Sequence, residues 1–138
     1  MSATAEELSP FERPDWFPRA EPGAKILVAG ATGGIGTCLV DMLLKSDGCI
    51  VGAHGFSRIP EWNSDRVIGL QRKLKDEQAC RSLVEEFAEQ AGGITGIVAL
   101  VGSIRHNKHW DQFTGADWEE EIHMNLNVPF YLARAAME

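Results

Sequence analysis

The chain has 138 residues, of which 44% are hydrophobic and 24% are charged, and its formal net charge is -7. This length and composition predict one globular domain with an ordinary core and exclude disorder of the whole chain. The acidic balance argues against nucleic-acid binding, because neutralising phosphates requires a concentrated face of Lys and Arg.

No apolar run approaches the roughly 20 residues that span a bilayer. The acidic start, residues 1–7, lacks the basic and apolar regions of a signal peptide. We therefore expect a cytoplasmic protein with no membrane partner. The three cysteines, Cys38, Cys49 and Cys80, show no C-x-x-C spacing, so we expect small core side chains and no metal site.

Residues 1–23 differ in composition from the rest of the chain. This segment holds four of the six prolines, Pro10, Pro14, Pro18 and Pro22, and three aromatic residues, Phe11, Trp16 and Phe17. Prolines at this spacing forbid both a regular helix and a strand ladder, so we predict an extended arm. Two interpretations stay open: the aromatic residues pack across a surface of this chain or a neighbour, or the arm is a loose extension.

From Lys25 onward, short apolar strands alternate with helices. The expected strands cover residues 26–29, 49–53, 67–70 and 97–101. The expected helices begin near Ile35, at Asp76 and after Thr114, where Thr114 and Asp117 form a capping-box pattern. This alternation predicts a doubly wound parallel α/β sheet over residues 24–138, with any ligand at the carboxyl ends of the strands.

Apolar residues at helical spacing predict the buried face of each helix. They are Ile35, Leu39, Met42 and Leu43 in the first helix, Cys80, Leu83, Val84, Phe87 and Ala91 in the second, and Trp118, Ile122, Leu126, Phe130 and Ala133 in the last. The expected ends are Ser46-Asp47-Gly48 for the first helix and Gly92-Gly93 for the second.

A glycine-rich loop separates the first strand from the first helix. Its glycines let the backbone turn sharply and approach a phosphate that rests on the helix N-terminus. The sequence therefore predicts a dinucleotide site. The candidate binding residues are Gly30, Thr32, Gly33, Gly34, Ile35 and Gly36. The alternative is that these glycines only permit a tight turn in a protein that has lost its cofactor.

The loop Gly30-Ala31-Thr32-Gly33-Gly34-Ile35-Gly36 resembles the T-G-x-x-x-G-I-G loop of short-chain dehydrogenases/reductases, with Ala29 in place of the leading Thr. Asp76, Trp118 and the pattern Asn125-Leu126 followed by Phe130 also resemble that family. The resemblance runs from about Lys25 to the end of the chain. It implies a Rossmann-like fold and a nicotinamide-dependent oxidoreductase that acts on an alcohol/carbonyl pair.

The resemblance implies that the residues after the second strand determine whether NAD or NADP is bound. The segment Ala53-His54-Gly55-Phe56-Ser57-Arg58 offers no acid for an adenosine ribose, so Ser57, Arg58 and His54 favour NADP slightly over NAD. The alternative is that Arg58 is a solvated loop residue.

Two segments depart from the family pattern. Lys73 stands where the family places an Asp that accepts from the adenine amino group, and an ammonium group has donors only. The family's N-N-A-G is replaced by Ala99-Leu100-Val101-Gly102, which keeps only the glycine. Both changes make the site degenerate.

Asn125 is the candidate catalytic residue. Pro129 has no N–H to donate to the carbonyl of Asn125, so we expect this carbonyl to be able to hold a water. The resemblance implies that such a water belongs to a proton relay that leads to a Lys. The alternative is a simple kink in the helix.

The catalytic Ser and Tyr-x-x-x-Lys of the family have no counterpart here, since Tyr131 is followed four residues later by Ala135. Three hypotheses follow. The chain is the cofactor half of an oxidoreductase that another segment or chain completes, or a non-catalytic structural subunit that pairs with an active partner, or a piece of a longer protein. We expect another protein chain or segment to complete the sheet and cover the last helix, in a homo- or hetero-oligomer.

Overall fold

The computed structural model describes residues 19–59, 62–102, 104 and 108–138. The strands are β1 (Lys25–Ala29), β2 (Ile50–Gly55), β3 (Val67–Gln71) and β4 (Gly96–Ala99). They form one parallel sheet in the order β3-β2-β1-β4, which confirms the predicted fold class. The last strand ends at Ala99, earlier than predicted. The prolines and aromatic residues of the predicted arm lie outside the described residues, except for Pro22.

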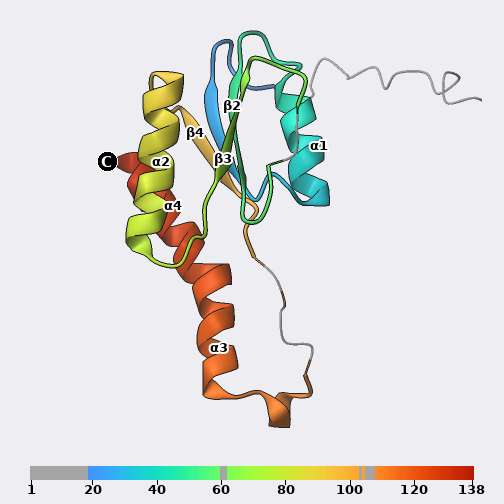
Figure 1. Cartoon of the computed structure of the whole chain (residues 1–138), viewed down its shortest axis with the longest axis vertical. Helices are drawn as coiled ribbons and strands as arrows, with labels where there is room; N and C mark the ends of the chain where they lie inside the picture. The colour runs from blue at the N-terminus through green and yellow to red at the C-terminus, as the bar shows by residue number, and fades with distance from the viewer. Residues whose placement is uncertain (1–18, 60–61, 103, 105–107) are drawn as a thin grey trace, which may run out of the picture.

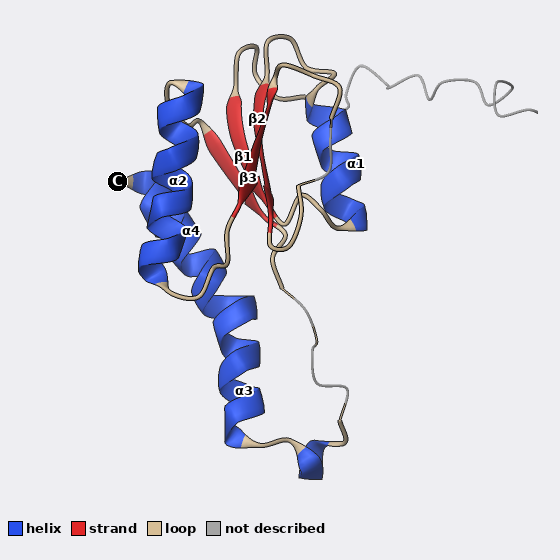
Figure 2. Cartoon of the chain, viewed as in Figure 1, coloured by secondary structure: helices blue, strands red, loops and turns tan. Residues whose placement is uncertain are grey.

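Helices cover both faces of the sheet. Helix α1 (Gly34–Leu43) lies on one face, and α2 (Glu77–Ala91) and α4 (Val128–Met137) lie on the other (Figure 1). Helix α3 (Gly115–Ile122) extends away from the sheet, and a short 3₁₀ turn, Trp110–Gln112, precedes it (Figure 2). None of the described helices is long and apolar enough to cross a membrane.

The core consists of two apolar clusters, one on each face of the sheet. On the α2 side, Leu27 of β1 packs with the buried α2 residues; these are Cys80, Leu83, Val84, Phe87 and Ala91. The predicted buried face of α2 is therefore confirmed. Gly52 of β2 makes room for Phe87, because a Cβ at residue 52 would lie 2.5 Å from the Phe87 ring. On the α1 side, Val28 and Val51 pack with Val40.

The predicted face of α1 is partly wrong. Ile35 is 76% exposed and Met42 is 37% exposed, whereas Gly36 and Val40 are buried. The helix turns its glycine toward the sheet because the β1–α1 loop passes too close for a side chain, as described below. This rotation also exposes Cys38, contrary to the prediction, while Cys49 and Cys80 are buried as expected.

The last predicted helix is not continuous. A π-helical segment, His123–Asn127, separates α3 from α4, and the Val128 N–H donates to the His123 carbonyl five residues earlier. The wider turn rotates α4 relative to α3. As a result Val128 and Leu132 are buried instead of the predicted stripe, whose members Trp118, Leu126 and Phe130 are 60%, 61% and 59% exposed.

Both ends of α2 and the start of α3 follow the sequence signals, whereas α1 ends at Leu43, before the predicted Ser46-Asp47-Gly48. Asp76 accepts a hydrogen bond of 2.8 Å from the Ala79 N–H at the start of α2, and Gly92 ends this helix at a φ of 72°. Thr114 and Asp117 form the predicted capping box of α3. A hydrogen bond from Lys108, 2.9 Å long, and those from Thr114 hold the pKa of Asp117 well below its usual range.

Candidate dinucleotide-binding site

The glycine-rich loop is compact because two of its glycines touch backbone atoms. Gly30 has a φ of 91°, and a Cβ there would lie 2.9 Å from the carbonyl carbon and oxygen of Leu100. A Cβ at Gly36 would overlap the Gly30 carbonyl oxygen and lie 2.7 Å from the Ala31 Cα. Both positions therefore require glycine, and β1 turns into α1 directly against the end of β4.

The space in front of α1 is open. A Cβ at Gly34, the first residue of α1, would meet nothing within 4 Å, and no side chain caps this helix at Gly33. The first backbone N–H groups of a helix have no partner within the helix and carry a partial positive charge. This loop therefore has the shape and the polarity to hold a pyrophosphate.

The loop lies where the strand order reverses. The chain runs from β1 outward to β3 and then returns to place β4 on the other side of β1. In open parallel sheets, ligands bind at the carboxyl ends of the strands beside this point. Gly30 and Leu100, which follow β1 and β4, meet there, and the Leu100 N–H donates to the Ala29 carbonyl at 2.8 Å.

The loop after β2 folds back beside Thr32. A Cβ at Gly55 would overlap the Arg58 carbonyl oxygen and lie 2.5 Å from the Thr32 Cγ2. Ser57 and Arg58 are exposed at this position, and the Ser57 carbonyl accepts from the Gln71 side chain at 3.1 Å. The structure thus brings the two predicted sets of cofactor-binding residues together.

His54 has a role that the sequence did not reveal. It is buried, its Nδ1 accepts from the Gly30 N–H at 3.3 Å, and its Nε2 donates to the Arg72 carbonyl at 2.8 Å. Both ring nitrogens are therefore occupied, so His54 is not available to a phosphate, contrary to the prediction. Instead it joins the glycine-rich loop to the end of β3.

We expect the stability of the protein to fall with acidity because of His54. Burial lowers the pKa of His54 below its usual value, so the unfolded chain takes up a proton more readily than the folded one. The contribution of His54 to the free energy of unfolding should therefore be constant above about pH 6.5 and decrease as the pH falls below it. Urea unfolding at pH 7.5 and pH 5.5 measures this change. His54→Gln, which does not titrate, should show a smaller pH dependence; an unchanged one would exclude His54 as the source.

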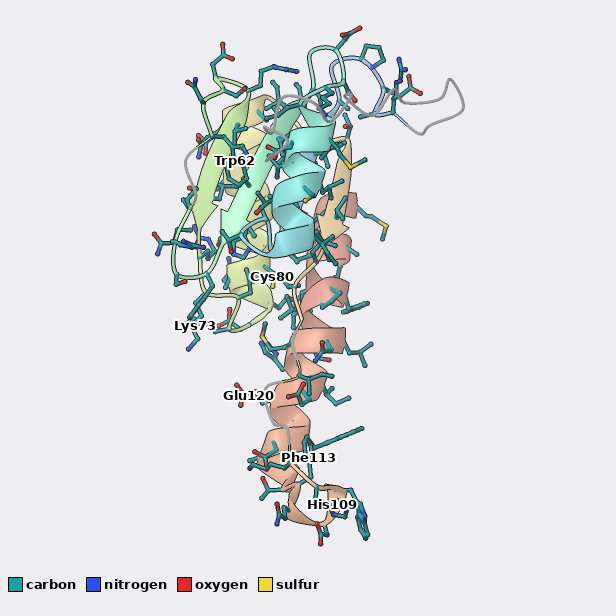
Figure 3. The ribbon with its side chains drawn as sticks, turned by 90° about the vertical axis from the view of Figure 1, so that its right-hand side faces the viewer. Trp62, Lys73, Cys80, His109, Phe113 and Glu120 are labelled. Carbon is teal, nitrogen blue, oxygen red and sulfur yellow. The ribbon has the colours of Figure 1, made fainter. Side chains whose placement is uncertain are left out.

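A cavity of about 300 Å³ lies at the same edge of the sheet. Its lining comes from the ends of β2 and β3, from the segment after β4 and from the α3–π junction. The residues are His54, Phe56, Arg72, Lys73, Leu74, Lys75, Val101, Glu120, His123 and Met124. Lys73 is one of these lining residues, and Figure 3 shows it at the lower end of the sheet, above Glu120 of α3.

Asn125 lies in the π-helical segment beside the end of β4. A Cβ at Gly102, whose φ is 147°, would lie 2.6 Å from the Asn125 Oδ1. The Asn125 Nδ2 donates to the carbonyl and the carboxylate of Glu121, at 2.9 and 3.1 Å. The structure thus places Asn125 against the glycine that survives from the family's N-N-A-G. Among the described residues, no three His, Cys, Asp or Glu side chains group as metal ligands would.

The family model described as "short chain dehydrogenase" matches residues 24–138. This match covers most of the chain, and the protein belongs to the short-chain dehydrogenase family. It is 33% identical over 120 residues to an acetoacetyl-CoA reductase of Allochromatium vinosum, covering 78% of this chain and 47% of the relative. It is 30% identical over 118 residues to nodulation protein G of Rhizobium sp. (strain N33), covering 81% of this chain and 47% of the relative.

Solved structures show the same fold. A short-chain dehydrogenase/reductase mutant of Serratia marcescens superposes with a TM-score of 0.73 at 18% identity, over 84% of this chain and 51% of that one. A short chain dehydrogenase from Burkholderia cenocepacia in complex with NADP gives 0.71 at 24% identity, over 84% and 50%. The chain thus spans about half the length of these relatives.

Proposed function

We propose that this chain is the cofactor-binding half of an NAD(P)-dependent oxidoreductase that acts on an alcohol/carbonyl pair. The observation that carries this proposal is the glycine-rich loop, which is held tight by Gly30 and Gly36 and is open in front of Gly34. When bound, the nicotinamide would supply hydride transfer, while the loop would hold the pyrophosphate on backbone N–H groups. A catalytic Ser, Tyr and Lys would come from another segment or chain.

Calorimetric titration of the purified chain with NADPH and NADH tests the proposal. We expect binding of at least one, with Ser57 and Arg58 favouring NADPH. Gly34→Ala should leave the fold intact but place a methyl group in the pyrophosphate space, and should weaken binding about tenfold or more. Gly115→Ala is the matched control, because Gly115 also begins a helix with open space around it. If neither nucleotide binds, the proposal is wrong.

We also propose that Asn125 holds a water in the proton relay of the completed enzyme. Its support is its place in the π-helical segment against Gly102, where a Cβ would lie 2.6 Å from the Asn125 Oδ1. In the completed enzyme, Asn125→Ala should lower kcat while the affinity for the cofactor stays the same. An unchanged kcat would contradict this role.

A non-catalytic structural subunit is the second candidate function. The observation that favours it is the exposed apolar stripe of Trp118, Leu126 and Phe130 along α3, the π-helical segment and α4, together with the lost family residues at Lys73 and Leu100. Such a subunit should be found with a partner that covers the stripe. Native mass measurement tests this candidate function. A lone, well-folded species of 15.2 kDa would contradict a structural subunit that needs a partner.

A further inference from the structure

The cavity beside Lys73 is part of the same surface as the glycine-rich loop. His54 lines this cavity and also accepts the hydrogen bond from the Gly30 N–H, so one side chain connects the two. Phe56, the first residue after β2, lines it as well. The adenosine end of a dinucleotide bound to the loop is expected near the end of β2, and therefore at this cavity.

The cavity is lined by more positive than negative side chains. Arg72, Lys73 and Lys75 are cationic, and Glu120 is the carboxylate among the lining residues. Arg72 is paired with Glu86 at 2.7 Å, and Lys75 lies 3.7 Å from Asp76.

Lys73 differs from its neighbours. Within the described part of the chain it forms no ion pair, and its Nζ lies 6.0 Å from the centre of the Phe56 ring. Its charge is therefore available to a ligand.

Two hydrogen-bond donors of the lining, the Lys73 ammonium and the Arg72 Nε, have no hydrogen-bond partner among the described residues. A lysine ammonium only donates, and the buried Nε of Arg72 has no hydrogen-bond partner. His54 and His123 use their Nε2 atoms on the carbonyls of Arg72 and Leu74, at 2.8 and 3.1 Å. The adenine amino group is itself a donor and gains little from these groups. An anion that accepts several hydrogen bonds suits this lining better.

We propose that Lys73 binds the 2′-phosphate of NADP(H) and thereby determines the preference for NADP(H) over NAD(H). This assignment rests on the proposed function and makes it specific. The 2′-phosphate is the anionic group that distinguishes the two cofactors, and it is carried on the ribose expected beside Phe56. The lysine that removes the family's adenine contact thus supplies a phosphate contact.

Titration calorimetry on four ligands tests the proposal: NADPH, NADH, 2′,5′-ADP and 5′-AMP. The chain should bind NADPH more tightly than NADH, and 2′,5′-ADP more tightly than 5′-AMP. Lys73→Gln should weaken NADPH and 2′,5′-ADP by about tenfold and leave NADH and 5′-AMP within about twofold. Lys73→Asp, which restores the family residue, should reverse the preference toward NADH. Thermal unfolding should be unchanged in both variants, because Lys73 is exposed.

Lys75→Gln is the matched control, since Lys75 lines the same cavity but is paired with Asp76. An equal loss in Lys75→Gln and Lys73→Gln would overturn the assignment, because it would reflect general charge and not a specific contact. Equal weakening of NADPH and NADH by Lys73→Gln, or equal affinities in the parent chain, would overturn it too. In those cases nucleotide still binds, so the proposed function stands; absence of all binding would overturn both.

Discussion

Gly36→Ala should unfold the glycine-rich loop, destabilising the protein by about 2–4 kcal/mol and abolishing NADPH binding. The added Cβ would overlap the Gly30 carbonyl oxygen and lie 2.7 and 2.8 Å from the Ala31 Cα and carbonyl carbon. These are backbone atoms between a central strand and its helix, so they cannot move aside as a flexible side chain can. Urea unfolding measures the loss of stability, and calorimetry measures the loss of binding.

Gly34→Ala is the control for Gly36→Ala, because it tests whether the loss of stability comes from the steric clash at residue 36 or from any glycine-to-alanine change in this helix. Its Cβ would meet nothing within 4 Å, and alanine is the better helix former. This variant should therefore be as stable as the parent chain or slightly more so. Similar stabilities for Gly36→Ala and Gly34→Ala would show that the β1–α1 contact is not as close as the structure has it.

Phe87→Ala should cost about 3–5 kcal/mol of unfolding free energy, the largest effect expected from a single core residue. Phe87 is fully buried, and its ring occupies the space that Gly52 leaves open on β2. The sheet cannot close over the vacated volume, because its strands are fixed by their ladders. Chemical denaturation of the parent chain and the variant measures the difference.

Trp118→Ala is the control, because it removes a larger aromatic side chain from an exposed position. It should change the unfolding free energy of the isolated chain by less than about 0.5 kcal/mol. A loss as large as that of Phe87→Ala would mean that Trp118 is covered in solution, and it would contradict the exposure seen in the structure.

The sequence predicts the parts of the fold that depend on local signals. The buried face of α2 follows from Cys80, Leu83 and Phe87 at helical spacing, and its ends follow from Asp76 and Gly92. The parallel sheet follows from the alternation of apolar strands with helices. Each of these needs only neighbours in sequence, and each is confirmed.

The wrong predictions concern features that depend on contacts between residues far apart in the sequence. Periodicity cannot predict that α1 turns Gly36 toward the sheet, because this orientation depends on how near the Gly30 carbonyl lies. Periodicity also cannot predict which face of α4 is buried, because the π-helical segment adds a residue to one turn. As a result Leu132 is buried and Phe130 is exposed.

The candidate site also has a part that local sequence signals predict and a part that depends on contacts between distant residues. The glycine pattern predicts the loop that the structure shows, whereas the bridge made by His54 joins residues 24 positions apart on one side and 18 on the other. A histidine at a strand end carries no signal of such a bridge. The cavity beside Lys73 likewise requires four segments to meet, and only the folded chain brings them together.

The contact between Gly30 and Leu100 has a consequence for how this lineage can change. Gly30 touches the carbonyl carbon and oxygen of Leu100, which any residue at that position would possess. This contact therefore constrains the path of the main chain after β4, while the Leu100 side chain packs against the apolar cluster that includes Ala31 of the loop. The close approach at Gly30 involves only main-chain atoms of residue 100, so an amide side chain and a leucine side chain at this position are both compatible with the same turn.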